Sequence, residues 1–172
     1  MEITWLGHSC FLIKGKEQTI ITDPCHPDLG YRLGEPEADI VTLSHFHPGH
    51  GYIEGVANDP KQVRGPGEYE IGGTFIAGIA SFHDSKKGEV RGKNTIYVIE
   101  MDGMTLCHLG DLGHPLDSHL VEEMGDIGIL FLPRTSPFLS SWKEAIPVMK
   151  VPPISYSPAL LICLGSLATP ST

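Results

Sequence analysis

Three histidines lie within six residues, at His45, His47 and His50. Side chains at i and i+2 of an extended backbone point to the same side, and a turn through Pro48 and Gly49 can bring His50 to join the other two. Neutral imidazole is the commonest protein ligand for zinc and for its neighbours among the transition metals. The segment therefore predicts a metal site rather than a solvated loop that is merely rich in histidine.

A buried strand is expected to position this cluster, because the apolar run 40–43 precedes it directly. Open α/β folds place their chemistry at the carboxyl ends of such strands. A second apolar run, residues 74–80, is followed by His83, and a third, residues 105–109, is followed by Asp111. His83 and Asp111 are therefore predicted to share one site with the histidine cluster.

A metal ion at this site would support hydrolysis. Three nitrogen ligands at ~2.0–2.1 Å leave one coordination position open for water, and the ion lowers the pKa of that water to about 7. The result is a metal-bound hydroxide that acts as a nucleophile at neutral pH. Asp111 stands between Gly110 and Gly113, where the backbone can come close to a ligand, and its carboxylate is a candidate to bind metal and to bridge two ions.

Other histidines leave more than one interpretation open. His8 either orients a metal ligand, contacts the substrate or fills a turn between two strands. His114, which follows the Gly-Asp-Leu-Gly turn, is expected to line the cleft or to act as a proton donor. His26, His108 and His119 are interpreted as structural or surface residues.

The composition predicts a globular protein of one domain over residues 1–172, long enough to bury a core without metal or disulfide staples. With 12 Lys and Arg against 21 Asp and Glu, the net charge of −9 disfavours a long nucleic acid as the main partner, since phosphate neutralisation drives such binding.

The four cysteines form no Cys-x-x-Cys pair, which fits reduced thiols in a cytoplasm. The N-terminus lacks the pattern of a signal peptide, and no apolar run has the length of a membrane span.

Short strands with turns between them make up the first half of the predicted structure. Residues 3–6, 10–13 and 19–22 are apolar or β-branched runs that suggest an antiparallel meander. Residues 60–73 are dense in Gly and Pro and are interpreted as a connecting segment. The polar residues 86–93 are expected to form a mobile loop at the mouth of the site.

Helices join the strands in the second half. Residues 94–100 and 105–109 predict a hairpin, and a helix with an i, i+4 apolar repeat is expected to begin at Pro115. An apolar strand at 126–132 and a short helix at 142–149 follow. These elements together predict two sheets packed face to face with helices outside.

These motifs stand in the order used by the metallo-β-lactamase superfamily, which the chain resembles over residues 1 to about 133. More narrowly, it resembles small metal-dependent hydrolases related to the ascorbate-6-phosphate lactonase. The matching segments are Gly7-His8-Ser9-Cys10, Thr22-Asp23-Pro24, Leu43-Ser44-His45-Phe46-His47-Pro48-Gly49-His50-Gly51, Ser81-Phe82-His83-Asp84 and His108-Leu109-Gly110-Asp111-Leu112-Gly113. The resemblance implies an α/β (α+β) fold, an αββα sandwich of two mixed β-sheets with outer helices.

The resemblance also implies a set of metal ligands. The residues that match the ligands of a first ion are His45, His47 and His83. His50 and Asp111 match ligands of a second ion, and the resemblance favours a place for Asp23 beside the ions. The implied cofactor is zinc, as one or two ions, with manganese or iron as alternatives.

Two departures from the superfamily pattern concern the second ion. The pattern is His-x-His-x-Asp-His, and here Gly49 replaces the aspartate. The superfamily also closes the second site with a histidine from a late strand, whereas no histidine follows His119. One metal position is therefore expected to be well formed, and the second to be incomplete.

The C-terminal segment is unusual, and we expect it to be truncated or altered. Residues 151–172 contain no Asp, Glu, Lys or Arg, although 19% of the chain is charged. Codons can be chosen for residues 152–160 that read, one nucleotide later, as a segment containing Ile-Pro-Pro-His-Tyr, which is close to the closing motif. We therefore hypothesise a shifted reading frame near residue 151. A shifted frame is also suspected for residues 134–141. Coding DNA with no frame for Ile-Pro-x-His-Tyr would end this hypothesis.

The expected function is that of a metal-dependent hydrolase that uses a metal-bound hydroxide on an ester, lactone or phosphoester of a small molecule. The alternative is a degenerate member of the superfamily that binds metal without turnover, which the two departures motivate. A nuclease of the same superfamily is disfavoured, because such enzymes generally carry an additional substrate-binding domain. A homo-oligomer is compatible with each of these functions.

Overall fold

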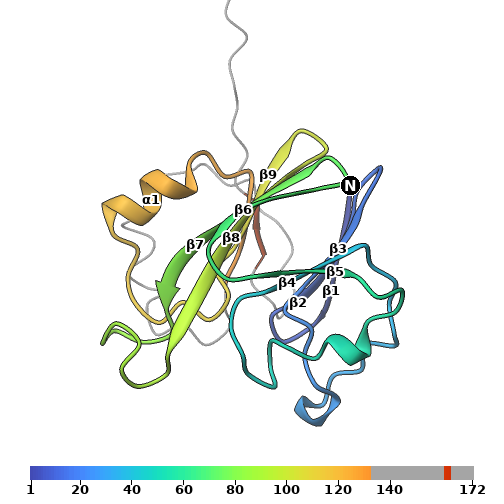
Figure 1. Ribbon diagram of the computed structural model, residues 1–172, viewed down its shortest axis with the longest axis horizontal. Helices are drawn as coiled ribbons and strands as arrows, with labels where there is room; N and C mark the ends of the chain where they lie inside the picture. Colours follow the sequence, from blue (N-terminus) through green and yellow to red (C-terminus); the bar gives the residue numbers. More distant parts are fainter. Residues whose placement is uncertain (133–160, 164–172) are drawn as a thin grey trace, which may run out of the picture.

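Two mixed β-sheets pack face to face in the computed structural model, which describes residues 1–132 and 161–163 (Figure 1). The first sheet has the order β1-β2-β3-β4-β5, and its strands are β1 (Glu2–Gly7), β2 (Cys10–Lys14), β3 (Thr19–Thr22), β4 (Ile40–Leu43) and β5 (Lys61–Arg64). The second has the order β11-β10-β9-β8-β7-β6, and its strands are β6 (Gly67–Ile71), β7 (Thr74–Phe82), β8 (Lys93–Met101), β9 (Met104–His108), β10 (Ile129–Phe131) and β11 (Leu161–Cys163). The predicted sandwich of two mixed sheets is confirmed.

The first sheet begins as the predicted antiparallel meander and then changes direction. β1, β2 and β3 are antiparallel neighbours, whereas β4 pairs in parallel with both β3 and β5. A strand with parallel neighbours is typically covered on both faces and apolar throughout. All four residues of β4 are buried, with Ile40 packed between the sheets and Val41 in the cluster on the opposite face. The histidine cluster therefore follows a central, rigidly held strand.

The second sheet is antiparallel from β6 to β9, then parallel between β9 and β10. The predicted hairpin is β8 and β9, joined by a turn at Asp102 and Gly103 in which both residues have positive φ. The interpretation of residues 60–73 as a connecting segment is wrong, because this stretch contains β5 and β6. Two of its glycines, Gly65 and Gly72, lie just beyond the strand ends with φ of 79° and 56°, conformations that favour glycine.

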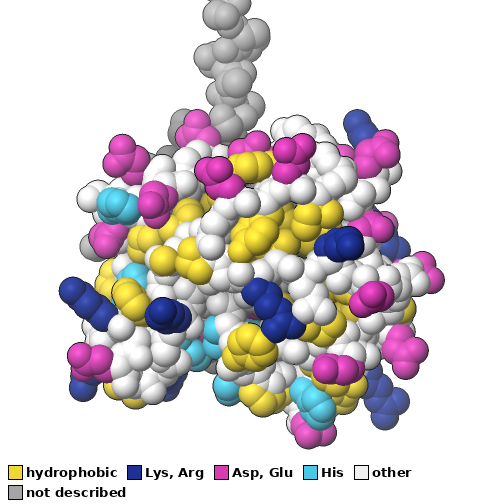
Figure 2. Space-filling view, in the orientation of Figure 1, with side chains coloured by type: hydrophobic (Ala, Val, Ile, Leu, Met, Phe, Trp, Pro, Cys, Tyr) yellow, Lys and Arg dark blue, Asp and Glu magenta, His cyan; other side chains and the backbone are white. Residues whose placement is uncertain are grey.

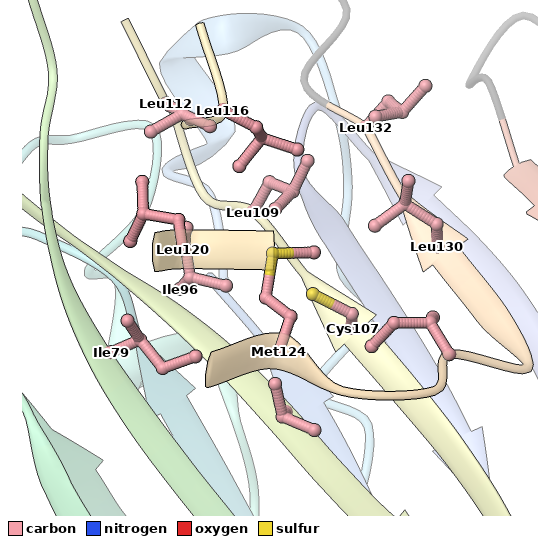
Figure 3. Close-up of a cluster of buried hydrophobic side chains, with 12 residues drawn as sticks. Ile79, Ile96, Cys107, Leu109, Leu112, Leu116, Leu120, Met124, Leu130 and Leu132 are labelled. Atoms are coloured by element: carbon pink, nitrogen blue, oxygen red, sulfur yellow. The ribbon is translucent and has the colours of Figure 1, made fainter. Parts of the chain in front are cut away.

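The helix α1 (Ser118–Met124) covers the outer face of the second sheet. Leu120 and Met124 belong to one buried cluster with apolar residues of β7, β8, β9 and β10 (Figure 3). The helix begins at Ser118 rather than at Pro115, because the carboxylate of Asp117 accepts a hydrogen bond from the N–H of Leu120 at 2.9 Å and caps the first turn. Within the described residues no helix is long and apolar enough to cross a membrane.

The outer face of the first sheet carries a separate apolar cluster. In the described part of the chain, it is covered by loops with the short 3-10 turns η1 (Pro27–Leu29) and η2 (Ile53–Gly55). The predicted helix at 142–149, residues 134–141 and the altered segment 151–172 lie outside the described residues, apart from β11, which pairs antiparallel with β10.

Candidate metal centre

Three strand ends meet at one edge of the sandwich. Residues 45–50 follow β4, His83 follows β7 directly, and Asp111 lies three residues beyond β9. The two sheets are tied together here, since the N–H of Thr95 at the start of β8 donates to the carbonyl of Ser44 at 2.9 Å. Figure 2 shows histidine side chains gathered near the lower centre of the molecule in this view. The topology thus brings together residues that are far apart in the sequence.

Two groups of possible ligand atoms share one carboxylate. His45, His83 and Asp111 offer atoms that all lie within 4.8 Å of one another, and so do His8, His50 and Asp111. Oδ2 of Asp111 is 3.2 Å from Nε2 of His83 and 3.2 Å from Nε2 of His50. Ligands of a tetrahedral zinc ion at ~2.1 Å are ~3.4 Å from one another. The spacing therefore fits ligands of a common ion, with Asp111 placed to bridge two ions.

Two buried imidazole nitrogens of the cluster lack a hydrogen-bond partner. Nε2 of His45 and Nε2 of His50 are both buried, and neither makes a hydrogen bond. Nε2 of His50 lies 3.2 Å from Oδ2 of Asp111 as a charge contact and not as a hydrogen bond. Buried polar atoms are nearly always paired, so unpaired ones call for an explanation such as an ion. The donor set of imidazole nitrogens and a carboxylate matches the ligands that zinc takes in proteins.

Asp23 contacts the ring nitrogen of His50 that faces away from Asp111. Its Oδ2 is 2.7 Å from Nδ1 of His50 and also accepts a hydrogen bond from the hydroxyl of Ser44 at 2.5 Å, while its Oδ1 accepts one from the N–H of Ser44 at 2.7 Å. His108 is close as well, with Nδ1 3.8 Å from Oδ2. A carboxylate at the far nitrogen of a ligating histidine fixes the tautomer and the ring orientation. Asp23 thus lies behind a candidate ligand, and its place beside metal ions stays a prediction.

The charges of the site are strongly coupled. Burial lowers the pKa of His45 to about 4, and the neighbouring His50 adds to this effect. Burial acts in the same direction on His50, but Asp23 and Asp111 outweigh it and raise the pKa of His50 to about 9. Burial raises the pKa of Asp111, yet His50 and His83 hold it well below its usual range. Without an ion, a proton on His50 offsets part of the negative charge of the two carboxylates, and a metal ion would have to displace it.

Backbone contacts fix the position of Asp111. Its N–H donates to Oδ1 of Asn94 at 3.0 Å, and the Asn94 amide donates in turn to the hydroxyl of Ser81 and the carbonyl of Leu109. Gly113 allows the loop to approach β7, because a Cβ there would lie 2.2 Å from the carbonyl carbon of His83. The sequence interpretation missed Asn94, whose only signal is an amide at the start of an apolar strand.

His8 belongs to the site as a member of one ligand group. Its ring is 5.0 Å from that of His50 at an angle of 68°. It stands in the turn between β1 and β2 with φ of 50°, and the indole N–H of Trp5 donates to its carbonyl at 3.0 Å. Asp23 also has a left-handed backbone, with φ of 38°. Such conformations are uncommon for residues other than glycine and cluster at functional sites.

Besides Asp23, two predicted site residues lie outside both ligand groups. His47 is exposed, stacks against His45 with ring centroids 6.0 Å apart, and accepts a hydrogen bond from the N–H of Gly49 at 3.2 Å. His114 accepts from the N–H of Phe82 through Nε2, at 3.3 Å, and donates through Nδ1 to the carbonyl of Pro115, at 2.9 Å. Both ring nitrogens of His114 are thus engaged by the backbone.

The loop after β7, which the sequence predicts to be mobile, is anchored by Asp84. The carboxylate of Asp84 accepts hydrogen bonds from the N–H groups of Lys86, Gly88, Val90 and Arg91. These contacts lower the pKa of Asp84 to about 2, with the N–H of Arg91 contributing most. A ring of donors around one carboxylate gives the loop a defined shape next to His83.

The two mixed sheets and the His–Asp cluster at their edge define a β-lactamase-like metal-site scaffold. A family model described as a beta-lactamase superfamily domain matches residues 2–152, so the chain belongs to this family. Relatives named as UPF0173 metal-dependent hydrolases include one from Methanoregula boonei, 27% identical over 85% of this chain and 75% of its own length. Another, from Thermococcus kodakarensis, is 27% identical over 91% of this chain and 85% of its own length. The relatives of this chain are thus named as metal-dependent hydrolases.

Solved structures agree on the fold. A candidate Zn-dependent hydrolase of the metallo-β-lactamase superfamily from Thermotoga maritima has a TM-score of 0.61 and 40% identity. The match covers 74% of this chain but only 58% of that chain, so this chain spans less than two thirds of that protein. A structure from Parabacteroides distasonis, 20% identical with a TM-score of 0.60 over 76% of this chain and 68% of that one, shares the fold.

Proposed function

We propose that the protein is a hydrolase that uses a metal-activated water on an ester, lactone or phosphoester of a small molecule. The observation that carries this proposal is the pair of unpaired buried nitrogens, Nε2 of His45 and Nε2 of His50, which belong to the two ligand groups that share Asp111. Membership of a family whose relatives are named metal-dependent hydrolases supports it.

Some side chains of the site would hold the metal ion, and others orient the side chains that hold it. His45, His83 and Asp111 would hold an ion at the open edge of the sheets. A bound zinc ion supplies a Lewis acid and a water of lowered pKa. Asp23 keeps the tautomer of His50 in which Nε2 faces Asp111, and Asn94 keeps the Asp111 loop in place.

Zinc is the proposed metal, because the donor set is dominated by imidazole. Manganese and iron, which accept more oxygen ligands, are the alternatives that metal analysis would separate. A small-molecule substrate fits the net charge of −9, which disfavours a long polyanion.

The test combines metal analysis with turnover. Protein purified without chelators is assayed on a 4-nitrophenyl ester, a simple lactone and bis(4-nitrophenyl) phosphate. We expect zinc to copurify, turnover of at least one substrate class, and a ~100-fold or greater loss in His45→Ala, a scale typical for removal of a group that stabilises the transition state. His119→Ala is the matched control, since the side chain of His119 is 77% exposed on α1.

One observation favours a second function, that of a metal-binding protein without turnover. Gly49 lacks the side chain that the superfamily pattern expects beside His50. One tightly bound ion with no hydrolysis of any of the three substrate classes would establish this alternative and reject the hydrolase.

A further inference from the structure

The space that a side chain at position 49 would occupy is filled by His8. A Cβ built on Gly49 would lie 2.8 Å from Nε2 and 3.0 Å from Cδ2 of the His8 ring. Real Cβ atoms essentially never come this close, so a side chain at Gly49 and the His8 ring in its present position exclude each other. The imidazole therefore takes up space that the side chain of an aspartate at this position would need.

The His8 ring also lies beside His50 and Asp111, the candidate ligands of the second ion, where the glycine at position 49 supplies no metal ligand. A ring nitrogen of His8 lies with a ring nitrogen of His50 and an oxygen of Asp111, all within 4.8 Å of one another. Nε2 of His50 is buried and has no hydrogen-bond partner. It lies 3.2 Å from Oδ2 of Asp111 without forming a hydrogen bond, and a buried polar atom without one calls for an explanation such as an ion.

The backbone holds His8 in this place. Its φ of 50° lies in the left-handed region, and its carbonyl accepts the indole N–H of Trp5 at 3.0 Å. The preceding Gly7, with φ of 126°, lets the turn pack against Tyr31, because a Cβ there would lie 2.3 Å from the Tyr31 ring. These contacts fix the backbone of the turn from which the His8 ring projects.

We propose that His8 is a metal ligand that, with His50 and Asp111, holds a second ion in place of a side chain from position 49. The exchange replaces an anionic oxygen donor by a neutral nitrogen donor. The second position is thus selective for a borderline transition metal such as zinc over manganese, which prefers oxygen ligands. This inference deepens the proposed function. It rests on that function only to the extent that both concern the same metal centre.

Zinc titration of the ion-free protein tests the proposal without any need for turnover. His8→Asn is the suitable variant, because asparagine tolerates the left-handed backbone and its shorter side chain withdraws the donor. By calorimetry we expect two equivalents of zinc in the unchanged protein. In His8→Asn we expect one retained equivalent and a second weakened ~10-fold or more, the scale seen when the surroundings of a metal site are removed. His119→Asn is the control and should bind as the unchanged protein does.

Cobalt absorption and a double variant complete the test. Cobalt in place of zinc should give a visible spectrum whose second increment is missing in His8→Asn. The double variant His8→Asn with Gly49→Asp should regain the second equivalent, because the withdrawn ring frees the space for the carboxylate. Circular dichroism confirms that each variant is folded.

The outcomes separate this inference from the proposed hydrolase. Two equivalents of unchanged affinity in His8→Asn, or a single equivalent in the unchanged protein, would overturn the role of His8 even if the protein hydrolyses its substrate. Loss of the second equivalent in a protein without turnover would support His8 and reject the hydrolase. A double variant that binds like His8→Asn would overturn the claim that the two side chains share one place.

Discussion

The Oδ2 atom of Asp23 lies 2.7 Å from Nδ1 of His50, and both side chains are fully buried. This contact leaves Nε2 of His50 to face Asp111, 3.2 Å away. The other carboxylate oxygen of Asp23 accepts the N–H of Ser44, the residue that follows β4. The orientation of the His50 ring is therefore set by the backbone at the end of a central strand.

Asp23→Asn should weaken zinc binding by ~10–100-fold, because the amide cannot support the ligating tautomer as the carboxylate does. It should also destabilise the ion-free fold by ~3–5 kcal/mol, since it leaves the His50 charge buried with one partner removed. Calorimetric zinc titration and urea unfolding measure the two effects. Asp28→Asn, at a carboxylate that is 88% exposed, is the control. Equal zinc affinity in both variants would contradict the role given to Asp23.

Gly113→Ala should abolish tight metal binding although no ligand is changed. The added Cβ would lie 2.2 Å from the carbonyl carbon of His83, so the loops that carry His83 and Asp111 would have to separate. Gly51→Ala is the matched control, because its Cβ would meet only the carbonyl oxygen of His47 at an ordinary 3.5 Å. Zinc content after dialysis checks the prediction, which fails if Gly113→Ala keeps the same equivalents as Gly51→Ala.

The loop after His83 should lose its order in acid. The folded-state pKa of Asp84 is lowered to about 2, below the ~3.9 of an aspartate in the unfolded chain. The stabilising effect of the carboxylate is therefore complete above pH ~4 and is lost as the pH falls through ~2. Protection of the loop amides, followed by hydrogen exchange, should decline over this range. In Asp84→Ala we expect low protection at every pH, whereas Glu89→Gln in the same loop should retain the acid transition.

Arg64 is expected to contribute to the binding of anionic substrates. Its guanidinium carbon lies 5.0 Å from the ring centroid of Phe46, a side chain that is 81% exposed and directly follows His45. Because guanidinium binds phosphate oxygens in pairs, Arg64→Ala should raise KM for bis(4-nitrophenyl) phosphate by ~10-fold with little change in kcat. Steady-state kinetics test this, with a neutral ester as control substrate and Lys61→Ala as control variant. An equal rise in KM for the neutral ester would exclude a charge effect.

Local sequence patterns predict a strand correctly where the polarity of its residues matches their burial in the fold. The run 40–43 identifies β4 because a strand covered on both faces must be apolar throughout, and the cluster after it is then placed by topology. β5 and β6 escape prediction because they are short and half exposed and alternate with turn glycines. Propensity alone cannot separate such edge-like strands from a loop.

Contacts between distant segments explain what could not be predicted at the site. The sequence leaves the role of His8 open, because nothing local shows that its ring fills the space beside Gly49. Asn94 is missed for the same reason, since its partners lie across two strands. The frame-shift hypothesis for the C-terminal segment stays a prediction, to be decided on the coding DNA.

The left-handed backbone of His8 places the stability of the fold in conflict with the chemistry of this centre. The conformation costs ~1–3 kcal/mol for a residue with a side chain, and glycine or asparagine would relieve it. A substitution that readily stabilises the protein is thus one that removes an imidazole from the site. A library of variants selected only for resistance to heat should therefore be enriched in inactive proteins changed at position 8.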